Sequence, residues 1–319
     1  MQDNAVWNGL YSVCSSGGRE EGSMGQNGAN ALVLEGGGYR DVFTAGVLDV
    51  LMERGIYDFE SVWGVSAGAL AATSYVSRQI GRTIRIMLAF RDDKRLMSFF
   101  SLVTTGNMTG GDFLYHTVQE ELDPYDIKTF NASEMRMFAV ASDVLFGTPR
   151  YFEVRSLPED VDAIRASSSL PLVSTTVSID GHRYLDGGTT DSVPVDVALG
   201  FSRPDDLDDY APAKRALVVL TRQRDYVKGD KLERMAILSR RYADYPLYLD
   251  ALRTRAKRYM EQRERIWQLE REGKILVLLP EGPVKIATAE HEGWPMLELY
   301  LQGRRQAEQR IDEIEEFLK

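Results

Sequence analysis

The hydrophobic positions near the start of the chain follow the pattern of an α/β protein. Residues 31–34 form a short, uninterrupted apolar run beside a glycine cluster, as is typical of a strand buried on both faces of a parallel sheet. Apolar residues then recur at helical spacing over 42–51, and Gly55 supplies a stop signal. A second strand is predicted over 59–64 and a second helix over 67–78. This order predicts an α/β fold with a mostly parallel central sheet flanked by helices.

The remaining pattern divides the chain into three parts. Residues 1–30 are rich in Gly, Ser and Asn without a sustained period, so we expect a disordered leader. The α/β domain is expected over 31–225 and a mainly helical C-terminal extension over 226–319. Further strands are predicted over 137–141, 177–179, 216–221 and 274–279, and further helices over 82–122 with a break at 106–111, 159–168, 231–242, 245–272 and 294–318.

Charge is distributed unevenly along the chain. The net charge of -10 argues against nucleic acid as a partner, because neutralising phosphates requires a basic face. Residues 222–271 nevertheless carry 14 Lys and Arg against 8 Asp and Glu. Such an excess is typical of a solvated helix face, and it also fits peripheral contact with an anionic membrane surface. The apolar run at 96–103 is equally compatible with a lid, an interfacial patch or an ordinary buried element.

Targeting signals and cysteine usage indicate the compartment. No stretch approaches about 18 uninterrupted apolar residues, and the N-terminus lacks a charged segment followed by an apolar one. The single cysteine, Cys14, excludes an internal disulfide framework and a multi-thiolate metal site. We therefore expect a cytoplasmic protein, peripheral to a membrane where it meets one.

The segment Gly64-Val65-Ser66-Ala67-Gly68 carries the first candidate chemistry. It matches the nucleophile elbow, in which a strand turns sharply into a helix and glycines on either side of the serine avoid clashes. Its place between a predicted strand and a predicted helix agrees with that motif. The pattern predicts Ser66 as a nucleophile, against the alternative of a tight turn that buries a structural serine.

A glycine run, Gly36 to Gly38, follows the first predicted strand. Successive backbone N–H groups at a helix N-terminus can bind a phosphate or a developing oxyanion. A phosphate loop needs Lys followed by Ser or Thr after its last glycine, and a dinucleotide fingerprint would place its last glycine at Asp41. An oxyanion hole is the better interpretation, and no nucleotide cofactor or metal is expected.

A serine nucleophile needs a base, and the chain has only three histidines, His116, His182 and His291. In the order of α/β-hydrolases His291 would be the base, but here the glycine loop follows the first strand and the serine follows the second. This order favours a carboxylate. Asp186, in Tyr184-Leu185-Asp186-Gly187-Gly188, is the candidate, although Asp-Gly-Gly alone commonly makes turns.

Three features now occur in order: Glu-Gly-Gly-Gly-Tyr-Arg at 35–40, Gly-Val-Ser-Ala-Gly at 64–68 and Asp-Gly-Gly at 186–188. Together they resemble the patatin-like phospholipase family, as do Arg-Ala-Ser-Ser-Ser-Leu-Pro at 165–171 and Val-Pro-Val at 193–195. The resemblance covers 31–225 as the catalytic domain, and residues 226–319 are similar to the helical extension of bacterial members. It implies a three-layer α/β fold, a Ser-Asp dyad, a lipid ester substrate and no cofactor.

Carried over by residue, the resemblance makes Ser66 the nucleophile and Asp186 the base, with the elbow flanked by Gly64 and Gly68. The N–H groups around Gly36, Gly37 and Gly38 would stabilise the oxyanion, and Arg40 matches the basic position of the loop. The expected activity is that of a phospholipase A or lysophospholipase.

Asp41 departs from the family pattern, because a glycine usually ends that loop. A carboxylate there would oppose the charge that develops on an oxyanion, and an aspartate tolerates positive φ less well than glycine. The alternative is therefore a catalytically weak lipid-binding or regulatory protein on the same fold.

Overall fold

A central sheet of eight strands runs through the part of the chain that the computed structural model describes, residues 29–93, 113–207, 209–287 and 290–319. Seven strands form the order β5-β6-β3-β2-β1-β7-β8, and β4 pairs with β3. The strands are β1 Asn30–Leu34, β2 Ser61–Val65, β3 Arg136–Asp143, β4 Pro149–Val154, β5 Val177–Ile179, β6 His182–Asp186, β7 Arg215–Val219 and β8 Ile275–Leu278.

The five strands β3, β2, β1, β7 and β8 are parallel, whereas β4, β5 and β6 join antiparallel. The helices are α1 Val42–Glu53, α2 Ala67–Val76, α3 Arg82–Ala89, α5 Ile127–Asn131, α6 Val161–Ser167, α7 Val195–Ala198, α8 Lys231–Leu238, α9 Pro246–Arg271, α10 Gly293–Gln309 and α11 Ile311–Leu318, with a π-helix at Phe113–Leu122 and short 3-10 turns at Gly38–Asp41, Gly187–Thr189 and Asp205–Leu207.

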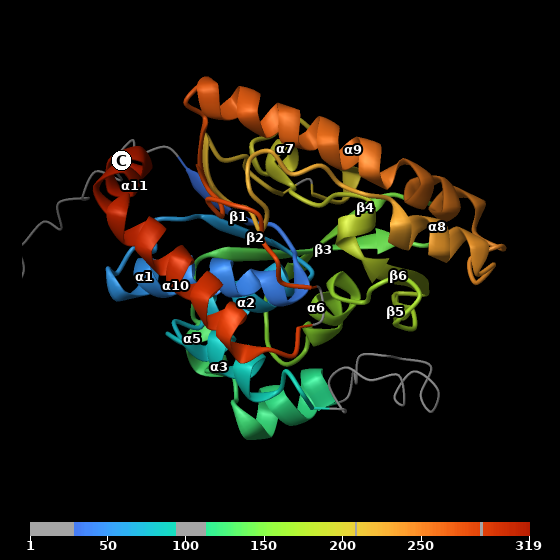
Figure 1. Cartoon of the computed structure of the whole chain (residues 1–319), viewed down its shortest axis with the longest axis horizontal. Coiled ribbons are helices and arrows are strands. Elements are labelled where there is room, and N and C mark those ends of the chain that lie inside the picture. The colour runs from blue at the N-terminus through green and yellow to red at the C-terminus, as the bar shows by residue number, and fades with distance from the viewer. Residues whose placement is uncertain (1–28, 94–112, 208, 288–289) are drawn as a thin grey trace, which may run out of the picture.

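The strands divide their side chains between two hydrophobic cores. In β1, Leu32 and Leu34 pack with the core that contains α1, α2 and α10, whereas Ala31 and Val33 pack with the core that contains α7 and α9. This alternation is that of a sheet covered on both faces. Figure 1 shows α9 above the sheet and α1, α2 and α10 below it. The predicted three-layer α/β fold is confirmed.

The C-terminal part is joined closely to the sheet. β8 pairs in parallel with β7, and α10 lies against α1 (Figure 1). A Cβ at Gly46 of α1 would lie 2.2 Å from the Tyr300 carbonyl oxygen, and one at Gly303 of α10 would lie 2.2 Å from that of Phe43. The two helices therefore cross in close backbone contact, which only glycine allows.

Some predicted boundaries are wrong. The final helix is two helices, because Arg310 leaves helical geometry at φ -108 and ψ 15 and donates to the Val277 carbonyl oxygen at 2.7 Å. α8 ends at Leu238, ahead of Arg240 with its positive φ of 56°. Asn30, placed in the predicted leader, is the first residue of β1. The rest of that leader, with Cys14, and the apolar run at 96–103 lie outside the described residues.

Candidate active site

Ser66 lies at the sharp turn between β2 and α2, with φ 55 and ψ -126. A positive φ in a non-glycine residue is strained by about 1–3 kcal/mol, and such strain is typical of functional sites. A Cβ at Gly64 would lie 2.5 Å from Ala69 Cα, and one at Gly68 would lie 2.7 Å from the Leu34 carbonyl oxygen. The chain can therefore turn here only with glycine on both sides of the serine.

Strand register brings Asp186 next to this turn. β4 occupies one edge of β3 over residues 137–142, so β2 and β6 must share the other edge. Val65, the last residue of β2, pairs with Val140, and Asp186, the last residue of β6, pairs with Ala141. Neighbouring positions on a strand are about 3.3 Å apart. Ser66 and Asp186 therefore meet, although 120 positions separate them in the sequence.

The stretch at 165–171 contacts both residues. Ser167 Oγ accepts a hydrogen bond from the Ser66 N–H at 2.9 Å, and the Ser169 carbonyl oxygen accepts one from the Asp186 N–H at 2.7 Å. Both acceptor residues lie at the end of α6 or directly after it. This segment therefore fixes the backbone of the serine and of the aspartate relative to each other.

The Asp186 carboxyl is buried, with 2% of the residue exposed. Its Oδ1 accepts from the Gly188 N–H at 2.8 Å, whereas Oδ2 has no hydrogen-bond partner within the described part of the chain. Burial raises the pKa of Asp186, and the Ser66 hydroxyl, Arg255, the Gly188 N–H and Lys228 lower it by smaller amounts. A carboxylate with a raised pKa and a free oxygen is a stronger base than an exposed aspartate.

The glycine loop packs directly on the serine. A Cβ at Gly36 would lie 2.3 Å from the Val65 carbonyl oxygen and 2.6 Å from Ser66 Cβ. Gly38 has a positive φ of 59°, which glycine adopts without strain. Within the described residues the N–H groups of Gly36 and Gly38 have no acceptor. Two unused backbone donors thus lie beside the candidate nucleophile.

Asp41 differs from the sequence-based expectation. Its φ is -66, so the position has no need of a glycine. The side chain is fully buried, and this burial raises the pKa of Asp41 well above its ordinary value, with Arg40 acting in the opposite direction. Burial therefore acts against the negative charge that the sequence led us to expect beside the glycine loop.

Glu35 anchors the loop from its other end. Its Oε2 accepts from the Thr221 N–H at 2.7 Å and from Thr221 Oγ1 at 3.2 Å, and its Oε1 accepts from the Tyr259 hydroxyl. Thr221 follows β7, and Tyr259 lies on α9. The loop after β1 is therefore tied both to the sheet and to the C-terminal part.

α9 also holds the loop that follows Asp186. Arg255 Nε donates to the Gly188 carbonyl oxygen, and Arg255 Nη1 pairs with the buried Glu233 at 2.7 Å. Arg258 donates to the Thr189 carbonyl oxygen at 2.6 Å, and Gln262 Nε2 donates to Asp191 Oδ1 at 2.7 Å. Sequence reasoning assigned these residues no chemistry. Their only signal was the basic excess over 222–271.

Most of that basic excess is used within the molecule. Besides Arg255 and Arg258, Arg224 pairs with Glu270 at 2.7 Å, and Arg263 donates to the Gln223 carbonyl oxygen at 2.6 Å. Arg241 donates to the Leu172 carbonyl oxygen at 2.6 Å. The stretch is therefore not a continuous solvated basic face.

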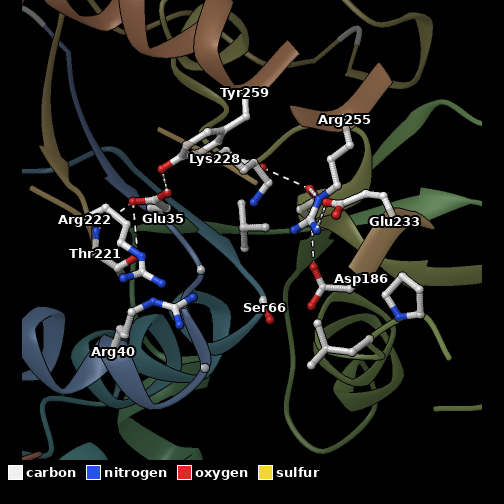
Figure 2. A pocket seen from close by; sticks show the side chains of 18 of the residues that line it. Glu35, Arg40, Ser66, Asp186, Thr221, Arg222, Lys228, Glu233, Arg255 and Tyr259 are labelled. Atoms are coloured by element: carbon white, nitrogen blue, oxygen red, sulfur yellow. Dashed lines mark hydrogen bonds and ion pairs between the residues drawn. The ribbon is translucent and has the colours of Figure 1, made fainter. Parts of the chain in front are cut away.

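Ser66, Asp186 and the glycine loop line one cavity of about 450 Å³. Figure 2 shows Ser66 at its base, Asp186 on one side and Arg40 on the other, with Lys228 and Tyr259 above. Arg40 lines the cavity beside Gly36, Gly37 and Gly38. Apolar residues complete the wall: Val65, Leu170, Pro171 and Val173.

The histidines that the structure describes lie elsewhere. His291 is exposed and pairs with Asp92 at 3.2 Å, and His182 pairs with Asp143 at 3.0 Å. Neither lines the cavity. The side chain of His116 falls outside the described residues. The geometry thus provides Ser66 with a carboxylate neighbour, Asp186, on an α/β sheet.

Comparison with known proteins identifies the family. The sequence matches the family described as patatin-like phospholipase over residues 32–199, more than half of the chain. The chain belongs to the patatin-like phospholipase family. A second match, to a domain of unknown function called DUF6363, covers residues 245–319, which include α9, β8, α10 and α11.

Two relatives illustrate the similarity. The uncharacterized protein YjjU of Escherichia coli (strain K12) is 32% identical over 176 residues, covering 53% of this chain and 48% of YjjU. The 1-acylglycerol-3-phosphate O-acyltransferase Pnpla3 of Mus musculus is 29% identical over 177 residues, covering 52% of this chain and 40% of Pnpla3. The matched region is thus about half or less of either relative.

A solved structure also matches in part. The crystal structure of VipD from Legionella pneumophila matches with a TM-score of 0.41 and 12% identity, covering 90% of this chain and 67% of VipD. Separately, none of the helices in the described part of the chain combines the length and apolar character needed to cross a bilayer.

Proposed function

We propose that this protein is a serine acyl hydrolase of lipid esters, of the phospholipase A or lysophospholipase type. The observation that carries the proposal is the junction of β2 and β6, where a strained elbow places Ser66 beside a buried aspartate with a free oxygen. The family membership and the apolar residues of the cavity support a lipid ester as substrate.

In the proposed mechanism Ser66 Oγ attacks the ester carbonyl carbon while Asp186 accepts the hydroxyl proton. The negative charge moves to the carbonyl oxygen, where the N–H groups of Gly36 and Gly38 stabilise it. Collapse of this intermediate breaks the bond to the alcohol, which leaves with the proton from Asp186. Water, deprotonated by Asp186, then attacks the acyl-serine carbonyl carbon. Collapse of this second intermediate breaks the bond to Ser66 Oγ, which takes the proton back from Asp186, and the fatty acid is released.

The structure weakens the case for a catalytically feeble regulatory protein. That case rested on Asp41, through its charge and through strain at its backbone. The negative φ of Asp41 removes the argument from backbone strain, and burial, which raises the pKa of its carboxyl, weakens the argument from charge. An active hydrolase is therefore the better conclusion.

The proposal includes peripheral contact with a membrane. α8 begins at the rim of the cavity with Lys231 and exposes Met235 and Leu238, which are 53% and 81% exposed. Apolar side chains beside a cation suit an anionic bilayer surface. This face would bring the cavity to the lipid.

Release of fatty acid tests the proposed function. The purified chain should liberate free fatty acid from phospholipid or lysophospholipid in EDTA, because the dyad requires no metal. Mass spectrometry measures the products. If neither lipid nor a short p-nitrophenyl ester loses its acyl group, the proposal is wrong.

Arg255→Gln should move the acid limb of the kcat/KM profile to higher pH. The base works as a carboxylate, so activity falls as the pH drops through the raised pKa of Asp186. Arg255 lowers that pKa, and its removal therefore raises it further. The profile is measured with a p-nitrophenyl ester.

Arg258→Gln is the matched control. Arg258 lies on the same helix and holds the neighbouring Thr189 carbonyl oxygen. We expect it to change the rate without moving the acid limb. An unchanged limb in Arg255→Gln, or an equal displacement in both variants, contradicts the assignment of Asp186 as the base.

A further inference from the structure

One side of the cavity is cationic. Figure 2 shows Arg40 and Arg222 next to each other on the side of Ser66 away from Asp186, with Lys228 above Ser66. Arg40 comes from the turn after β1, whereas Arg222 and Lys228 both come from the segment between β7 and α8. All three line the same cavity as Ser66. Two segments that are far apart in the sequence therefore bring positive charge to this cavity.

Lys228 and Arg222 lack anionic partners. Lys228 is half-buried, and its Nζ lies 4.7 Å from the centre of the Tyr259 ring. Within the described part of the chain it forms no hydrogen bond and no ion pair. Arg222 stacks on the Tyr226 ring at 4.6 Å and donates to the Val284 carbonyl oxygen at 3.0 Å, and it pairs with no described carboxylate.

The carboxylates of the cavity are already engaged. Glu35 accepts from Thr221 and Tyr259, and Glu233 pairs with Arg255 at 2.7 Å. The third, Asp186, lies beside Ser66. Burial, followed by the neighbouring cation Arg222, lowers the pKa of Arg40, while Asp41 and Glu35 act in the opposite direction. Burial, followed by Arg255, lowers the pKa of Lys228 to about 7.

We propose that Arg222 and Lys228, beside Arg40, bind the phosphate of a glycerolipid ester, so that the protein prefers acidic lysophospholipids and phospholipids to neutral acylglycerols. This inference rests on the proposed function and adds the headgroup class. Charged groups that repel one another in a half-buried site are stabilised by an anion. A phosphate with several acceptor oxygens can contact several cations at once, and the planar fork of Arg222 matches its geometry.

The dimensions of the cavity suit this assignment. Its volume of about 450 Å³ is in the range of small-molecule sites. In a glycerophospholipid only a few bonds separate the acyl ester from the phosphate. With the ester at Ser66, the phosphate would reach the cationic side, and the apolar wall at Leu170, Pro171 and Val173 would receive the start of the acyl chain.

Binding to the inactive Ser66→Ala chain tests the headgroup without catalysis. Calorimetry would compare a short-chain lysophosphatidic acid, the monoacylglycerol with the same chain, and inorganic phosphate, all below micellar concentrations. We expect lysophosphatidic acid to bind at least about 10-fold more tightly than either of the others. Equal affinity for the two lipids, or inorganic phosphate binding as tightly as the lipid, would overturn the proposal.

Variants assign the preference to residues. In Arg222→Gln and Lys228→Gln the affinity ratio of lysophosphatidic acid to monoacylglycerol should fall about 10- to 100-fold, and Lys228→Arg should retain most of it. Lys257→Gln, the same charge change on the exposed face of α9, is the control and should leave the ratio unchanged. Melting curves confirm that each variant folds. An unchanged ratio in both cavity variants would refute the site.

The two proposals can fail separately. If the chain binds lysophosphatidic acid selectively but releases no fatty acid, the proposed function fails and the anion site stands. If fatty acid is released from neutral and anionic esters with equal kcat/KM, the hydrolase stands and the headgroup assignment fails.

Discussion

Alanine at position 66 should reduce kcat/KM for ester hydrolysis at least about 10⁴-fold, and asparagine at position 186 should have an effect of similar size. Ser66→Ala removes the oxygen that forms the acyl bond. Asp186→Asn keeps the shape of the side chain but removes the base. The two losses should not add, because nucleophile and base act as one unit. Hydrolysis of p-nitrophenyl butyrate by the two single variants and by the double variant with both changes measures these losses.

His291→Ala is the control for the alternative base. His291 is exposed, pairs with Asp92 and does not line the cavity, so its removal should leave kcat/KM unchanged. A large loss in this variant, or activity retained by Asp186→Asn with an unchanged melting temperature, would contradict the Ser-Asp dyad.

Gly36→Ala should lower kcat about 10²- to 10³-fold, the size expected when an oxyanion donor is misplaced. The new Cβ would lie 2.3 Å from the Val65 carbonyl oxygen, so the loop must move away from Ser66. Such overpacking should also lower the free energy of unfolding by about 1–3 kcal/mol. Steady-state kinetics and urea denaturation measure the two effects.

Gly282→Ala is the matched control, because a Cβ there has no atom within 4 Å and its φ is not in the left-handed region. It should leave both quantities near their wild-type values. If Gly36→Ala keeps full activity, the glycine loop does not hold the oxyanion.

Local sequence patterns predicted the elements that carry the serine. The apolar runs of β1 and β2 are buried on both faces, and each is followed by a helix. The change from an uninterrupted apolar run to helical spacing could therefore be recognised in the sequence. The glycines at 64 and 68 were predicted because backbone geometry, not a distant partner, requires them. The elbow is therefore a local property of the chain.

β4 could not be predicted from the same pattern. Its sequence, Pro-Arg-Tyr-Phe-Glu-Val, mixes polar and apolar residues because it lies at an edge of the sheet and is only partly buried. The burial of Asp41 could not be predicted either. A sequence shows the carboxyl group but not the surroundings that raise its pKa.

The role of α9 depends on tertiary structure. Tyr259 reaches Glu35, and Arg255 reaches the Gly188 carbonyl oxygen, through contacts between residues far apart in the chain. No motif marks either residue, since a tyrosine or an arginine on a charged helix has no local signature of its partner. The cationic side of the cavity was missed for the same reason.

Labelling with a fluorophosphonate tests the central claim most directly, because the probe reacts covalently with activated serines. The native chain should take up one equivalent, and mass spectrometry of the digested protein should place the label on Ser66. Asp186→Asn should label far more slowly. A label on any other residue, or none under conditions in which the chain hydrolyses an ester, would contradict the account.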